Sequence, residues 1–389
     1  MASKKWIGVN KCKIAIYKGK DENGRSLYHR ETVHGDEKTV DLRIAEIETD
    51  MHRGEYQEPS KLLFGAFAEE FLEGHAQNVS EGTLENYKGY LKNYIKKDPL
   101  ARMKVVKIAP LDIQRYINRV AAGPRADGKP GTLSAKTVRE QLALLKLIFA
   151  HACFWQIRKD NPAQYVKAPK VERKAVAFYD SEQAIRFLTA AEGNRFYLFF
   201  LFALMTGLRQ GELRGALRSS LNLEKCTMLV DNSVRKSGSK SVLKNPKTEG
   251  SFATIQFPEW FVPLFKDHFK QVAAERLAYG PTYGKRDNGE PFPEFVFPGQ
   301  NGRPIAPKIL YKHYRQIIEK AGLPYIKFHS LRHSCASLLL EVGVDLKRIQ
   351  EKLRHTDIRT TMNIYGHLIP NAQKVANEKL TELLKIKTR

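Results

Sequence analysis

A tyrosine stands in the stretch LRHTDIRTTMNIYGH, which covers residues 353–367. Tyr365 follows His355 by ten residues and is surrounded by threonines and arginines. In most proteins such a tyrosine packs against its own domain, with its hydroxyl group hydrogen-bonded. A tyrosine can also act as a nucleophile and hold a phosphate covalently. Which interpretation applies to Tyr365 depends on what the rest of the chain can supply.

A second stretch, HSLRHS (residues 329–334), places three basic side chains close together. His329 and Arg332 are one helical turn apart and would share a face of a helix. His329 and His333 could instead bind zinc, but that site needs further ligands. The sequence offers neither the glutamate of an HExxH motif nor a cysteine pair. We therefore expect no metal and no other cofactor, and a structural role for His333.

The stretch TGLRQGELRG (residues 206–215) places Arg209 just after a Thr-Gly break. Glu212, three residues on, would lie on the same helical face and could hold the arginine for phosphate recognition. The alternative is a local Arg–Glu surface pair. In KNPKTEGS (residues 244–251), Lys247 is expected in a turn between strands, from which a lysine can reach a leaving group. Exposed hairpins are often basic, so this signal is weak alone.

Together these groups fit phosphoryl transfer. A phosphodiester under attack develops negative charge, and two arginines can bind its oxygens through paired hydrogen bonds. Histidine or lysine can donate or move protons, and a tyrosine can attack and conserve the energy of the bond for rejoining. Fixed cations can replace a metal in stabilising the transition state. The sequence shows no acidic cluster of the kind that a two-metal nuclease uses.

The order of these residues resembles that of the tyrosine recombinase, or phage integrase, family. The resemblance covers nearly the whole chain, and phage or conjugative-transposon integrases with an N-terminal arm-binding domain are the similar members. Each motif alone is modest, whereas the set in this order is highly specific. The matching positions are Arg209, Lys247, His329-x-x-Arg332, His355 and Tyr365.

The resemblance implies a role for each matching residue. Tyr365 would be the nucleophile that forms a 3′-phosphotyrosyl link, and Arg209 and Arg332 would hold the scissile phosphate. Lys247 would protonate the departing 5′ oxygen. The resemblance also implies supporting roles for the remaining groups: His329 and His355 would donate hydrogen bonds or assist the proton of the tyrosine, and Glu212 would orient the site.

Two positions depart from the pattern of the family. Arg354 stands where the family usually has glycine, before the histidine that corresponds to His355. If this position needs a positive φ or a close backbone approach, the arginine is strained; alternatively, its charge helps to hold DNA. Ser330 stands where the family commonly has aspartate. Neither departure replaces a catalytic group, so we still expect activity.

Charge is the strongest bulk signal in this chain of 389 residues. There are 65 lysines and arginines and 42 acidic residues, a net charge of +23. Such an excess predicts attraction to polyanions, above all nucleic acid, although it is also compatible with a protein that is merely basic and soluble. The sequence shows no membrane span and no apolar signal-peptide core. Four widely separated cysteines fit a reducing cytosol, so we expect a cytoplasmic protein. The resemblance implies that it works in a bacterial host cell, in association with the nucleoid.

Periodicity and turn signals predict an α+β multidomain protein. Residues 1–60 should form a small three-stranded sheet with a hairpin turn at 22–25, followed by a helix that starts near Asp36. Residues 61–168 should be all-helical, with helices that start near Ser80, Pro110 and Ser134. The helix from Ser80 should run toward Lys97, and Asn161-Pro162 should stop the last one.

A linker at 169–177 precedes the third part. Residues 178–389 should be mainly helical with a small antiparallel sheet, including helices at 181–191 and 195–205 and strands at 227–230 and 252–257. A helix at 372–384 has an apolar face that could dock on a neighbouring subunit or pack on its own domain. In the terms of the resemblance, the three domains are an arm-type DNA-binding domain, a core-site-binding domain and a catalytic domain.

The resemblance implies a DNA strand transferase that integrates or excises a mobile element through a Holliday junction. Its partners would be double-stranded DNA at core and arm sites, three further subunits in a homotetramer, and an excision factor or a DNA-bending protein. Two alternatives remain: a type IB topoisomerase-like enzyme, and an architectural DNA-binding protein with an inactive site. The lopsided charge of residues 1–60, with eight basic and two acidic residues in 1–30 but three and nine in 31–60, suggests that the sheet meets the polyanion. Lysines that protect a sheet edge would give a similar pattern.

Overall fold

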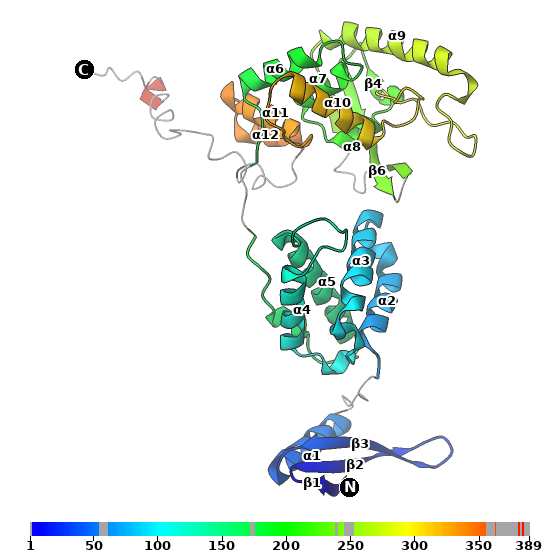
Figure 1. Ribbon diagram of the computed structural model, residues 1–389, viewed down its shortest axis with the longest axis vertical. Helices are drawn as coiled ribbons and strands as arrows, with labels where there is room; N and C mark the ends of the chain where they lie inside the picture. Colours follow the sequence, from blue (N-terminus) through cyan, green and yellow to red (C-terminus); the bar gives the residue numbers. More distant parts are fainter. Residues whose placement is uncertain are drawn as a thin grey trace. The chain divides into compact units, whose positions relative to one another are not determined.

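The computed structural model describes residues 2–53, 61–171, 176–237, 240–244 and 253–354, together with 362, 380, 381, 383 and 384. The chain forms two compact units, residues 1–172 and 173–389 (Figure 1). The described residues are mainly helical with small antiparallel sheets, which confirms the predicted fold class. No helix among them is long and apolar enough to cross a membrane.

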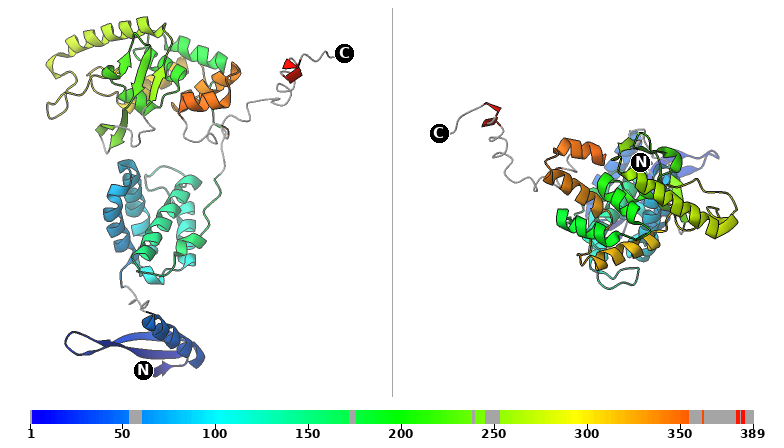
Figure 2. Two further views of the ribbon diagram at one scale, coloured as in Figure 1. Left: turned by 180° about the vertical axis from the view of Figure 1, so that it is seen from behind. Right: turned by 90° about the horizontal axis from the view of Figure 1, so that it is seen from above.

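The N-terminal residues form the predicted three-stranded antiparallel sheet and helix. The strands are β1 (Ala2–Gly8), β2 (Lys11–Lys20) and β3 (Ser26–His34), in the order β1-β2-β3, and the helix is α1 (Glu37–His52). Asp36 caps α1 by accepting a hydrogen bond from the Thr39 backbone N–H, as expected of an N-cap aspartate. Helix α1 lies along one face of the sheet (Figure 2, left). Because strand residues alternate between faces, Cys12, Ile14 and Ile16 pack toward the helix.

The opposite face of this sheet is basic and aromatic. In the register, Lys5 pairs with Lys13, and Tyr17 pairs with Tyr28. The two tyrosine rings lie edge to face at 5.7 Å, and the guanidinium group of Arg30 lies 5.8 Å from the Tyr28 ring. We call Lys5, Lys13, Tyr17, Tyr28 and Arg30 the open face.

A separate helical core occupies residues 61–171. Ser80 and Ser134 cap two of its helices as predicted, each by accepting a hydrogen bond from the N–H three residues on. The first of these helices ends at Asn93, not near Lys97, because the backbone turns out of the helix at Tyr94 and continues in a short 3-10 turn. The second ends seven residues before Asn161. The helices are α2 (Phe64–His75), α3 (Glu81–Asn93), α4 (Pro110–Ala122) and α5 (Ala135–Phe154).

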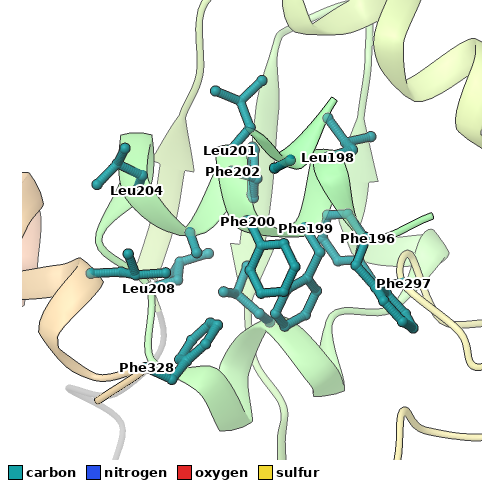
Figure 3. Packing of buried hydrophobic residues seen from close by; sticks show 14 of the residues in the cluster. Phe196, Leu198, Phe199, Phe200, Leu201, Phe202, Leu204, Leu208, Phe297 and Phe328 are labelled. Atoms are coloured by element: carbon teal, nitrogen blue, oxygen red, sulfur yellow. The ribbon is translucent and has the colours of Figure 1, made fainter. Parts of the chain in front are cut away.

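The second unit is built around a buried aromatic helix. Helix α7 (Tyr197–Thr206) is buried along most of its length, and its phenylalanines pack with Phe297 and Phe328 (Figure 3). This core fixes the end of α7, from which the TGLR turn leaves. The helix begins at Tyr197, two residues later than predicted, because Asn194 holds residues 194–197 in a turn: its side-chain oxygen accepts from the Phe196 N–H at 2.9 Å and its carbonyl accepts from the Tyr197 N–H at 2.8 Å.

The remaining elements of this unit surround α7. One three-stranded sheet has the order β4-β5-β8, and a separate two-stranded hairpin contains β6 and β7. The helices are α6 (Ser181–Ala191), α8 (Gln210–Gly215), α9 (Phe261–Tyr279), α10 (Pro307–Lys320), α11 (Ser330–Glu341) and α12 (Leu346–Leu353); the strands are β4 (Leu221–Asn222), β5 (Thr227–Val230), β6 (Ser233–Ser237), β7 (Lys240–Lys244) and β8 (Ala253–Gln256).

Candidate active site

The TGLR turn places Arg209 at the start of helix α8. Gly207 ends α7 in the left-handed conformation, with φ +64°, so the chain reverses there at little steric cost. Arg209 is the N-cap of α8, and Glu212 is its third residue. The Glu212 carboxylate accepts from the Arg209 backbone N–H at 2.9 Å and from Arg209 Nη1 at 3.0 Å. The local Arg–Glu pair inferred from the sequence is present.

Glu212 also forms an ion pair with a second arginine, Arg354. Arg354 Nη2 donates to Glu212 Oε2 at 2.5 Å, and the two side chains are only 16% and 13% exposed. Burial alone would raise the pKa of Glu212, but the charges and hydrogen bonds of Arg354 and Arg209 outweigh it, and the pKa is lowered. Glu212 is therefore a carboxylate at neutral pH, shared by two guanidinium groups.

Arg332 is an interior residue that joins two distant turns. Its side chain lies in the first turn of α11 and is 3% exposed. Nη1 donates to the Gly207 carbonyl at 2.6 Å, and Nη2 donates to the carbonyl of Leu353, the last residue of α12. The guanidinium group thus fixes the end of α7 against the end of α12.

His329 is the N-cap of helix α11 and lies at the surface. Partial burial lowers its pKa, and the positive charges of Arg332 and Arg209 lower it further. These electrostatic contacts show that His329, Arg332 and Arg209 gather in one place. The His333 ring lies edge to face with that of His329 at 5.2 Å, and His333 is buried. The described residues contain no group of three or more side chains placed to hold a metal ion.

Three predicted residues fall outside the part of the chain that the structure describes: Lys247, His355 and Tyr365. The predicted helix at 372–384 also lies mostly outside it. The structure therefore brings together four of the seven predicted site residues, namely Arg209, Glu212, His329 and Arg332.

Two glycines that were not among the predicted residues, Gly211 and Gly215, allow strand β6 to pack against α8. A Cβ on Gly215 would lie 2.9 Å from the backbone nitrogen of Val234, and one on Gly211 would lie 3.0 Å from the Val234 carbonyl oxygen. Both positions therefore require glycine if strand β6 is to lie directly on the helix that begins at Arg209. Their spacing of four in QGELRG places two small residues on one helical face, and this signal could have revealed the contact.

Similarity to known proteins extends along both units. Residues 177–371 match the model of the phage integrase family, and residues 63–121 match the N-terminal SAM-like domain of phage integrases. A protein of Caldanaerobacter subterraneus named tyrosine recombinase XerC-like is 31% identical over 95% of this chain and 96% of its own length.

Two solved structures share the fold. The integrase of transposon Tn1549, solved with a circular intermediate DNA, superposes with a TM-score of 0.66 at 20% identity, over 82% of this chain and all of that one. A lambda integrase tetramer bound to a Holliday junction gives a TM-score of 0.54 at 15% identity, over 89% of this chain and 93% of the other.

Proposed function

Because the chain belongs to the phage integrase family, we propose that it is a site-specific DNA recombinase that integrates and excises a mobile element. The gathering of Arg209, Glu212, His329 and Arg332 at one site supports this proposal. Its net charge of +23 suits a DNA substrate. Such an enzyme works where chromosomal DNA is, which would be the cytoplasm and nucleoid of a bacterial cell.

In the proposed reaction the Tyr365 oxygen attacks the scissile phosphorus, and a bond forms to the 3′ phosphate as the bond to the 5′ oxygen breaks. Lys247 gives its proton to that departing oxygen. Arg209 and Arg332 stabilise the negative charge that builds on the phosphate oxygens. Rejoining reverses the step: a 5′ hydroxyl from the partner strand attacks the phosphotyrosine and releases the tyrosine.

The remaining histidines and Glu212 would support the charged groups. His329 has a lowered pKa, so it would be neutral at pH 7 in the free protein and could donate one ring N–H to a phosphate oxygen or accept a proton. His355 would accept the proton that the Tyr365 hydroxyl loses as its oxygen bonds to phosphorus. Glu212 would hold Arg209 in place, as its two hydrogen bonds to that residue indicate.

Exchange of both strand pairs requires two duplexes. We propose a homotetramer on DNA that resolves a Holliday junction, as the lambda integrase structure captures for that protein. The helix expected at 372–384 would dock between subunits. An excision factor or a DNA-bending protein would set the direction of recombination.

Covalent capture tests the chemistry. A suicide duplex made from the ends of the mobile element, located by footprinting, should become linked to the wild-type protein, and Tyr365→Phe should abolish the link. Tyr165→Phe is the matched control, since Tyr165 lies in the helical domain and is 72% exposed. An adduct with Tyr365→Phe would contradict the assignment. Relaxation of a two-site plasmid with no recombinant product would indicate a topoisomerase instead.

We further propose that the open face of the N-terminal sheet contacts arm-site DNA. Its lysines supply positive charge, and phosphate neutralisation releases counterions, so binding should weaken steeply with salt. Deleting residues 1–60 should spare core-site cleavage and weaken arm-site binding; unchanged arm-site affinity would reject this assignment.

A single-residue comparison is sharper than the deletion. Lys13→Ala removes a charge from the open face and should reduce the salt slope of arm-site binding by about one. Lys4→Ala is the control, because Lys4 pairs instead with Asp41 and Glu37 of helix α1. Equal effects of the two substitutions would show that the open face has no special part in binding.

A further inference from the structure

Arg354 adopts a backbone conformation that disfavours its own side chain. It ends helix α12 with φ +54° and ψ +49°, in the left-handed region that suits glycine. Its N–H closes the last turn by donating to the Glu351 carbonyl at 3.0 Å. Glycine would form the same cap without the steric cost, so the side chain of Arg354 must be understood from its contacts.

Those contacts lead to a residue 142 positions earlier in the chain. The Arg354 guanidinium group binds Glu212 Oε2, while Glu212 Oε1 binds Arg209 Nη1. Arg354 Nε is buried and has no hydrogen-bond partner among the residues that the structure describes, so the ion pair with Glu212 is the contact that accounts for the position of this side chain. A solvent-facing arginine would reach water with all of its donors.

The backbone next to Arg354 is fixed from the other side as well. The carbonyl of Leu353 accepts from Arg332, and the Leu353 side chain is fully buried. The carboxyl end of α12 is therefore tied to Arg332 through a carbonyl and to Arg209 through Glu212. These are the two arginines proposed to bind the scissile phosphate.

We infer that Arg354 is a positioning residue, which holds Glu212, and through it Arg209, in the geometry needed for strand cleavage. The inference rests on the proposed recombinase function. Arg354 makes its contribution through the ion pair with Glu212 and does not contact the DNA. The left-handed backbone directs its side chain back toward α8, and the ion pair compensates for the conformation.

The first test compares cleavage with binding. Arg354→Gly keeps the left-handed cap and removes the whole side chain, and with it the guanidinium group that binds Glu212. We expect covalent adduct formation to slow by between about tenfold and about a hundredfold, as small misplacements of catalytic groups do. The affinity for DNA and its salt slope should stay unchanged. Arg348→Ala is the control for lost charge, since Arg348 lies on the same helix with its side chain 81% exposed.

Chemical rescue separates positioning from a general structural role. Guanidinium ion added to Arg354→Gly should restore part of the cleavage rate by occupying the vacated site beside Glu212. It should have no such effect on the double variant Glu212→Gln/Arg354→Gly. That double variant should be no slower than the slower of its two parents, because both substitutions break one interaction.

Several outcomes would overturn the inference. A wild-type cleavage rate in Arg354→Gly would do so, as would a drop in its salt slope by about one, which marks a lost phosphate contact. Rescue that persists in the double variant would also reject it. If the wild-type protein forms no adduct, the proposed function fails, and the ion pair is then judged by thermal unfolding. Melting temperatures that change additively in the double variant would show that the pair is not formed.

Discussion

Gly207 offers a quantitative test of how the site is assembled. With φ +64°, alanine at this position costs about 1–2 kcal/mol in backbone conformation. Its Cβ would also lie 2.5 Å from Leu353 Cδ2. Overpacking of this kind costs a further 1–3 kcal/mol, roughly. The two terms together predict a loss of about 2–5 kcal/mol for Gly207→Ala.

Gly193 is the matched control within the same unit. It has φ +75°, and an added Cβ would meet nothing within 4 Å. Gly193→Ala therefore carries the conformational cost alone. Calorimetry of the full chain should show a larger fall in melting temperature for Gly207→Ala; an excess of about 2 kcal/mol corresponds to about 4–8 °C in a domain of this size.

A double variant identifies the source of the difference. Leu353→Ala removes the atom that the new Cβ would strike, so on that background Gly207→Ala should cost no more than Gly193→Ala does. Gly207→Ala should also slow DNA cleavage, because the Gly207 carbonyl accepts a hydrogen bond from Arg332. Equal losses for the two glycine variants in the wild-type background would refute the proposed contact with Leu353.

Two further predictions concern His329 and the glycines. The pKa of His329 is lower in the folded protein than in the unfolded chain, so below about pH 6.5 the unfolded chain binds a proton more readily than the folded protein does. The stability that neutral His329 contributes is therefore present above about pH 6.5 and declines as the pH falls. Urea unfolding of His329→Gln at about pH 7.5 and about pH 5.5 should show a smaller decline than wild type, and an unchanged decline would contradict this reasoning. Gly215→Ala should destabilise the protein by about 1–3 kcal/mol through its clash with strand β6. Gly89→Ala, in the middle of α3 with open space around it, should instead stabilise the protein by about 0.5–1 kcal/mol; thermal unfolding checks both, and shifts of the same sign would reject the distinction.

Helix starts could be predicted from the sequence because their causes are local. Asp36, Ser80 and Ser134 each cap a helix by binding an N–H three residues away. The start of α7 is wrong in the prediction although its cause is also local. The apolar pattern predicts a helix from Arg195, but the Asn194 side chain accepts from the Phe196 N–H and forms a turn, so the helix begins only at Tyr197.

At the site, too, contacts between neighbours in the sequence could be predicted, whereas contacts between distant positions could not. The pairing of Arg209 with Glu212 follows from a spacing of three residues. The contact of Arg354 with Glu212, and those of Arg332 with Gly207 and Leu353, connect positions that no local pattern relates. The sequence could raise the question of positive φ at Arg354, but only the fold supplies the carboxylate that it meets.

The described residues form four hydrophobic cores that share no member: one lies under the N-terminal sheet, one among helices α2 to α5, one around α7, and a small one between α11 and α12. A substitution that loosens one core therefore leaves the packing of the others intact. If the sheet binds distal DNA sites as proposed, mutations that change which sites are bound can then accumulate in this domain without a cost to the packing of the catalytic residues. Such separation would let integrases exchange whole N-terminal domains by recombination and acquire new attachment sites while keeping one catalytic unit.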